Sequence, residues 1–97
     1  MGDGVRAHVL LSGRVQGVAY RYFAEKYAAN LGIKGWVRNL GDGRVEVLAE
    51  GDRSHVDEFL ARLKEGPRLA RVEDFELRWE DYTGEFLDFR ITFDGGW

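Results

Sequence analysis

The sequence predicts an α+β sandwich with the element order βαββαβ, in which two helices pack on one face of an antiparallel sheet. Two observations lead to this expectation. Several short segments alternate apolar and polar residues, as half-buried strands do, and two longer segments repeat apolar residues at three- and four-residue spacing, as amphipathic helices do. The chain contains no linker-like or low-complexity stretch, so we expect one domain over residues 1–97.

The first half of the chain predicts a strand, a helix and a hairpin. Residues 6–12 alternate and are expected to form a strand, whereas residues 21–31 follow helical spacing. Gly32 then provides a C-terminal stop for the helix. Residues 34–40 and 44–50 are strand-like. The three residues between them read Gly-Asp-Gly, which is typical of a hairpin turn because these residues tolerate positive φ.

The second half predicts another helix and two more strands. Apolar residues mark a helix over residues 52–65, with Ser54 as its N-terminal cap and Gly66-Pro67 as its end. Residues 72–80 and 87–93 alternate strongly and read as strands. A Thr-Gly pair lies between them, so we expect a turn there and the final strand as an additional hairpin partner.

The charge distribution favours a small anionic ligand over a polyanion. The net charge is −3, yet residues 1–39 carry six Lys and Arg against two Asp and Glu, whereas residues 40–97 carry eight against fifteen. The acidic surface argues against a nucleic-acid partner, although so short a chain can show this asymmetry by chance. Without cysteine, a secretory signal or an apolar run near the ~20 residues of a membrane span, we expect no membrane partner and a cytoplasmic location by default.

The most informative segment runs from Gly13 to Arg21 and reads GRVQGVAYR. It joins a predicted strand to a predicted helix, contains two glycines and ends in arginine. The backbone N–H groups of such a loop, the positive end of a helix dipole and a guanidinium can together hold a phosphate-sized oxyanion. We therefore expect the anion to be bound by Gly13, Arg14, Val15, Gln16, Gly17, Val18, Ala19, Tyr20 and Arg21.

Two polar side chains are candidates for direct chemistry. Arg21, at the start of a helix, can pair with phosphate in bidentate fashion, or it is a solvated surface arginine. Asn39, near the end of a strand, can hold a water molecule in line with phosphorus, or it only caps the following turn. His8 and His55 are far apart in sequence and lack accompanying ligands, so we expect no metal site.

Two motifs resemble those of the acylphosphatases. Gly13–Arg21 is similar throughout to the family pattern G-x-V-Q-G-V-x-[FY]-R, with Tyr20 where phenylalanine is more usual. The segment GWVRNLGDGRVE, from Gly35 to Glu46, is similar to the second pattern, G-W-V-x-N-x-x-D-G-x-V-E. The resemblance covers nearly the whole chain and implies a ferredoxin-like fold. It also implies that Arg21 binds phosphate, that Asn39 orients the catalytic water, and that no cofactor is used.

By this resemblance the chain is expected to hydrolyse small acyl phosphates to a carboxylate and inorganic phosphate, by attack of water on phosphorus. A carboxylate leaving group has a conjugate acid with a pKa near ~4, so it departs without a general acid. We expect a metal-independent hydrolase that works as a monomer. Its partners would be the small-molecule acyl phosphate and inorganic phosphate, which is both product and competitive inhibitor.

Two other functions remain open on the sequence. The same cradle could bind a phosphorylated or carbamoylated ligand such as carbamoyl phosphate without catalysis, as an acylphosphatase-like module. RNA-recognition domains share the fold, but the acidic balance and the strand over residues 44–50 offer no basic, aromatic platform for bases. Hydrolysis of benzoyl phosphate separates an enzyme from a binding module.

Overall fold

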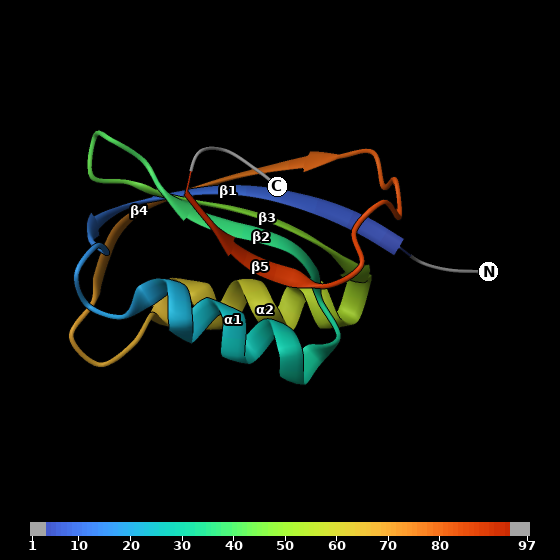
Figure 1. Ribbon diagram of the computed structural model, residues 1–97, viewed down its shortest axis with the longest axis horizontal. Coiled ribbons are helices and arrows are strands. Elements are labelled where there is room, and N and C mark those ends of the chain that lie inside the picture. Colours follow the sequence, from blue (N-terminus) through green and yellow to red (C-terminus); the bar gives the residue numbers. More distant parts are fainter. Residues whose placement is uncertain (1–3, 94–97) are drawn as a thin grey trace.

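A computed structural model describes residues 4–93, which form a five-stranded sheet with two helices on one face (Figure 1). The strand order is β4-β1-β3-β2-β5. Residues 1–3 and 94–97 of the predicted domain lie outside the described residues. The elements are β1 (Gly4–Arg14), α1 (Tyr20–Leu31), β2 (Lys34–Asn39), β3 (Val45–Asp52), α2 (Arg53–Glu65), β4 (Arg71–Glu80) and β5 (Phe89–Thr92).

The core lies between the sheet and the helices, and the alternation and helical spacing of the sequence account for it. Alternate residues of β1 from Ala7 to Leu11 are buried, and in β3 the six residues from Val45 to Glu50 are all buried. In the described part of the chain, neither helix combines the length and apolar character that a membrane crossing requires. The side chains that fill this core include Ala7, Val9, Leu11, Ala24, Ala28, Val45, Val47, Val56, Phe59 and Leu63.

Most of the predicted boundaries are confirmed. Gly32 ends α1 in the left-handed conformation, and its N–H group donates to the last carbonyls of the helix. The hairpin between β2 and β3 turns where expected, and Asp42 accepts a hydrogen bond from the backbone of Arg44 at 3.1 Å. The prediction that Ser54 caps α2 is wrong. The N-cap residue is Asp52, Ser54 lies in the first turn, and no side chain caps this helix.

The expected hairpin between the last two strands is also wrong. β4 pairs antiparallel with β1 at one edge of the sheet, whereas β5 pairs parallel with β2 at the other edge (Figure 1). The segment between them therefore crosses from one edge of the sheet to the other. The ferredoxin-like fold class is confirmed, with a sheet that is mixed because of this one parallel pair.

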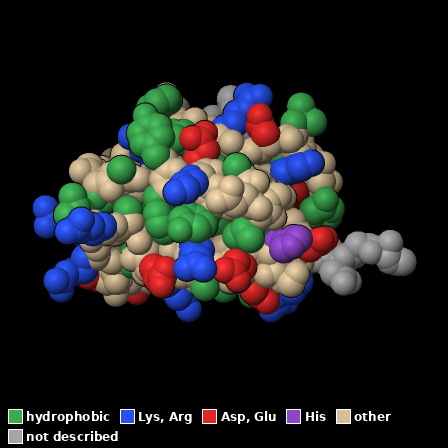
Figure 2. Space-filling view, turned by 90° about the horizontal axis from the view of Figure 1, so that it is seen from below, with side chains coloured by type: hydrophobic (Ala, Val, Ile, Leu, Met, Phe, Trp, Pro, Cys, Tyr) green, Lys and Arg blue, Asp and Glu red, His purple; other side chains and the backbone are tan. Residues whose placement is uncertain are grey.

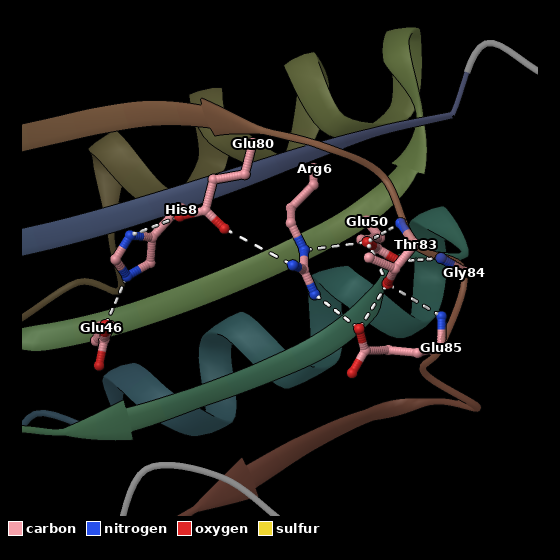
Figure 3. A network of polar contacts seen from close by, with 8 residues as sticks. All are labelled: Arg6, His8, Glu46, Glu50, Glu80, Thr83, Gly84 and Glu85. Atoms are coloured by element: carbon pink, nitrogen blue, oxygen red, sulfur yellow. Dashed lines mark hydrogen bonds and ion pairs between the residues drawn. The ribbon is translucent and has the colours of Figure 1, made fainter.

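A buried carboxylate holds the crossing segment in place. Glu50, only 3% exposed, accepts hydrogen bonds from the backbone N–H groups of Thr83 at 2.9 Å and Gly84 at 3.0 Å (Figure 3). Arg6 lies 3.1 Å from the same carboxylate and 3.3 Å from that of Glu85. A local alternation pattern carries no information about such a long-range anchor, which explains why the hairpin was expected.

The same polar network continues across the open face of the sheet, on the side away from the helices (Figure 3). His8 contacts Glu46 at 2.5 Å and Glu80 at 3.5 Å, and Arg38 donates to Glu46 at 2.6 Å. Burial by itself raises the pKa of Glu46, but the hydrogen bonds from His8 and Arg38 outweigh burial and hold this pKa below its ordinary value.

Glu46 is therefore expected to stabilise the fold in a pH-dependent way. Because its pKa is lowered in the folded protein, its contribution is present above the ordinary carboxyl pKa and is lost as pH falls through the folded-state pKa. Replacing Glu46 by glutamine should lower the free energy of unfolding by about 2 kcal/mol at pH 7, measured by urea denaturation. The difference between variant and wild type should shrink as pH falls below the ordinary carboxyl pKa of about 4.

Glu76 provides the control, because it is exposed and forms no ion pair with a described residue. Glu76→Gln should leave the unfolding free energy nearly unchanged, both at pH 7 and below the ordinary carboxyl pKa of about 4. A pH-independent loss in Glu46→Gln would contradict the assignment of this carboxylate to the acid-sensitive part of the network.

Candidate active site

Three segments meet at one end of the molecule. The loop of residues 15–19 joins β1 to α1 there, β2 ends at Asn39, and β4 begins at Arg71 (Figure 1). Lys and Arg side chains gather at this end of the molecule (Figure 2). The topology therefore brings the two sequence motifs, which are separated along the chain, to the same basic end of the sheet.

A β-bulge shapes the start of the loop. The register between β1 and β4 shifts between Ser12 and Gly13, and Glu73 is left without a partner. Gly13 has a φ of +116°, and a Cβ atom there would lie 2.3 Å from the carbonyl oxygen of Arg71. Glycine is needed at this position because the two backbones approach too closely for any side chain.

The loop backbone is shaped to present N–H groups. Gly17 has a φ of +73° and Ala19 a φ of +63°, whereas Val18 between them does not have positive φ. Alternation of this kind turns successive N–H groups toward one side and forms an anion-binding concavity. Within residues 4–93, Ala19 is the only non-glycine residue with positive φ, and strain of this type concentrates at functional sites.

The N-terminus of α1 lies directly behind this loop. Ala19 is its N-cap residue, no side chain caps the helix, and its first turn contains no acidic residue. The first N–H groups of a helix have no partner within the helix, and the helix dipole makes this end positive. The loop and the helix start can therefore act together on one anion.

Side chains of the loop fix its position. Gln16 donates two hydrogen bonds across to the hairpin turn, to the carbonyl oxygens of Leu40 at 2.8 Å and Arg44 at 2.9 Å. Val15 is fully buried and Val18 packs against the core. Both valine side chains therefore face inward, toward the core. The Gln16 amide, in contrast, is occupied in tying the loop to the residue after Asn39.

Tyr20 has a structural side chain. It is buried, its hydroxyl donates to the carbonyl oxygen of Leu63 near the end of α2, and burial raises its pKa. Only its backbone is therefore available to an anion. Tyr20→Phe is expected to lower the free energy of unfolding by about 1 kcal/mol, because a buried carbonyl loses its donor. Thermal or urea denaturation measures this change, and an unchanged stability would show that the hydroxyl contributes nothing.

Arg21 is half-buried at the start of α1, and its guanidinium forms no ion pair or hydrogen bond with any described residue. It lies over the ring of Phe93, 5.7 Å from the centroid. A cation beside the positive end of a helix dipole is unfavourable unless an anion lies between them. The ring attracts the guanidinium without using its N–H donors, so these donors remain available to a ligand.

Asn39 carries an unsatisfied polar atom. Its Oδ1 atom is buried, yet it has no hydrogen-bond partner within the described part of the chain. Asn39 lies opposite Val45 in the sheet register and therefore projects toward the same side as that core residue. A buried acceptor without a partner costs roughly 1–3 kcal/mol, so the structure provides a reason for a bound water or ligand there.

Sequence reasoning missed two neighbours of the predicted residues. Phe93, which is 73% exposed, was expected only as part of a strand, although its ring lies against Arg21. Arg71 was not singled out, although it lies directly opposite Arg14, which is exposed and unpaired within residues 4–93. Neither neighbour has a sequence signal of its own, because both positions depend on the register of distant strands.

Other regions of the molecule offer less to a ligand. A hollow of about 770 Å³ lies at the opposite end, around Gly32, Asp52 and His55. Its most buried polar group, Glu50, already accepts the hydrogen bonds of Thr83 and Gly84. Among residues 4–93, no three His, Cys, Asp or Glu side chains are grouped as a metal ion would require.

Comparisons with known proteins agree with the two motifs. A family model described as Acylphosphatase matches residues 7–91. The acylphosphatase of Methylococcus capsulatus is 54% identical over 89 residues, which cover 92% of this chain and 97% of that protein. The acylphosphatase of Roseiflexus sp. is 53% identical over 91 residues, covering 94% and 98% of the two chains.

Solved structures agree with the fold. The crystal structure of acylphosphatase from Bacillus subtilis superposes with a TM-score of 0.88 at 34% identity, covering 91% of this chain and 98% of that one. The fold also occurs within a longer protein. The structure of full-length HypF in its phosphate- and nucleotide-bound form matches with a TM-score of 0.83 at 26% identity, covering 99% of this chain and 13% of that one.

Proposed function

Because this chain belongs to the acylphosphatase family and hydrolyses acyl phosphates, we propose that the reaction takes place at the loop of residues 15–19, with Arg21 and Asn39 as its catalytic residues. The observation that carries this proposal is the buried, unpartnered Oδ1 atom of Asn39, which lies one residue before the carbonyl that Gln16 binds. The loop is thereby tied to the strand that carries this acceptor.

The phosphoryl group is proposed to bind between the loop and Arg21. The N–H groups of the loop and of the first turn of α1 donate to its oxygens, and the unpaired guanidinium donates from the other side. Phosphoryl transfer depends mainly on positioning and on stabilising the charge of the equatorial oxygens. These groups supply both.

The water is proposed to bind to Asn39. Its Oδ1 atom accepts a hydrogen bond from the water, which fixes the oxygen in line with phosphorus. The water oxygen forms a bond to phosphorus as the bond from phosphorus to the acyl oxygen breaks, and the electron pair leaves with the carboxylate. The water proton passes to a phosphoryl oxygen of the substrate, because neither Arg21 nor Asn39 is a base at neutral pH.

Steady-state hydrolysis of benzoyl phosphate, followed by phosphate release and with inorganic phosphate as a competitive inhibitor, tests the site as a whole. Competitive inhibition is expected, because product and substrate share the same cradle. Phosphate that inhibited without competing with benzoyl phosphate would place the anion site elsewhere. Binding of phosphate without any turnover would instead favour the non-catalytic module.

The proposal extends to the working state of the protein. We expect a monomer, because every group assigned to the reaction comes from residues 13–39 of one chain. We also propose a cytoplasmic location. Sedimentation equilibrium at the enzyme concentration of the assay, with and without phosphate, tests the monomer. Activity that rose with self-association would contradict it.

A further inference from the structure

Two arginines form an unneutralised pair beside the cradle. Arg14 and Arg71 lie directly opposite each other on the last rung of the ladder between β1 and β4, immediately before the loop of residues 15–19. Both are exposed, and neither forms an ion pair or a hydrogen bond with any residue of the described range 4–93. Like charges directly opposite each other in a sheet are destabilising, so this pair costs stability in the absence of an anion.

No described acidic side chain neutralises these two arginines. The chain has 17 Asp and Glu against 14 Lys and Arg, yet none of the described acidic residues pairs with either arginine. Glu73 is the nearest in sequence, being the residue that the bulge leaves unpaired, and its Cγ atom lies beside Gly13. The bulge thus leaves Glu73 out of the ladder in which Arg14 and Arg71 stand opposite each other.

The phosphoryl group does not account for this pair. In the proposed function, on which this inference rests, Arg21, the loop N–H groups and the start of α1 already surround the phosphate. Arg14 and Arg71 lie outside this set of groups, because Arg14 is the last residue of β1 and Arg71 is the first residue of β4. A substrate held in the cradle through its phosphoryl group extends its acyl part outward, because the core closes the cradle from within.

We propose that Arg14 and Arg71 form a second anion-binding subsite, which selects acyl phosphates that carry a further negative group, a carboxylate or a phosphate, on the acyl part. Guanidinium groups donate hydrogen bonds to carboxylates and phosphates, so both side chains can bind that group, and its charge relieves the repulsion between them. The subsite favours such substrates over neutral acyl phosphates of the same size. The preference weakens with added salt, since both arginines are exposed.

The test compares 3- and 4-carboxybenzoyl phosphate with the corresponding carbamoylbenzoyl phosphates, which have the same shape and no second charge. At low ionic strength the wild-type protein should hydrolyse at least one carboxylated substrate with a kcat/KM about fivefold higher than its neutral counterpart. Arg71→Gln should remove this ratio, and 0.5 M salt should reduce it. The 3- and 4-substituted substrates place the second charge at two different distances from the phosphate.

Arg78→Gln is the matched control. Arg78 lies on the same strand, is exposed and unpaired among residues 4–93, and stands opposite His8, far from the cradle. The Arg78→Gln substitution removes the same charge as Arg71→Gln and should leave the preference for carboxylated substrates intact. The inference is overturned if the wild-type protein shows no preference, or if Arg71→Gln keeps it, or if Arg78→Gln loses it equally. Failure to hydrolyse any of the four substrates would instead contradict the proposed function.

Discussion

Replacing Arg21 by alanine is expected to lower kcat/KM for benzoyl phosphate by about 10³-fold or more and to abolish measurable binding of inorganic phosphate. The guanidinium is the only side-chain cation that the proposed site places on the phosphoryl oxygens. Its N–H donors form no hydrogen bond or ion pair with described residues, and it lies over the ring of Phe93. Kinetics with benzoyl phosphate and isothermal titration with phosphate measure the two losses.

Arg21→Lys separates charge from geometry. Lysine restores a positive charge but provides a single ammonium in place of the planar fork, so most of the activity should remain lost. Both variants should keep the far-UV circular dichroism and the urea midpoint of the wild-type protein, because Arg21 is half-buried and its side chain bonds to nothing within residues 4–93. If Arg21→Ala bound phosphate with wild-type affinity, the assignment of Arg21 to phosphate binding would be refuted.

The sequence predicted those parts of the structure that depend on local patterns. The alternation of residues 6–12, the spacing of residues 21–31 and the Gly-Asp-Gly turn are short-range signals, and each lies where the structure has the corresponding element. The end of α1 at Gly32 follows for the same reason, because the left-handed conformation there suits glycine. Fold class and family therefore followed from residues close together in the chain.

One wrong prediction, Ser54 as the cap of α2, misses the N-cap residue by two positions. The other, the hairpin between the last two strands, concerns long-range pairing. A Thr-Gly pair between two alternating segments indicates a turn, but nothing in those segments says to which edge of the sheet the second returns. That choice is fixed by Glu50, which binds the backbone of Thr83 and Gly84 from a strand more than thirty residues earlier. A hairpin between the last two strands would deprive this buried carboxylate of its two backbone donors, at a cost in desolvation.

The site divides in the same way. The loop with its glycines and its terminal arginine was evident from sequence, since these are the residues that build an anion cradle. The hydrogen bonds of Gln16 to the hairpin, the ring of Phe93 and the pair of Arg14 with Arg71 were not, because each depends on strand register. Residues proposed from a local motif are thus easier to read from the chain than those whose position depends on pairing with a distant strand.

Asn39 should separate binding from turnover. Asn39→Ala is expected to leave the affinity for inorganic phosphate within about twofold of wild type while kcat for benzoyl phosphate falls by about 10² or more. The amide is proposed to contact the water and not the phosphoryl group, so its loss affects only the in-line attack. The buried Oδ1 atom that lacks a partner in the described structure is the acceptor this role requires.

Stability gives an independent readout of the same residue. If the Oδ1 atom were merely a turn cap, alanine would remove a stabilising bond and lower the unfolding free energy without a selective effect on kcat. The unsatisfied atom predicts the reverse: Asn39→Ala should unfold at the same or a higher urea concentration, because a buried polar group without a protein partner is removed. A variant that is as stable as wild type, binds phosphate and turns over slowly supports the water-holding role, whereas normal turnover excludes it.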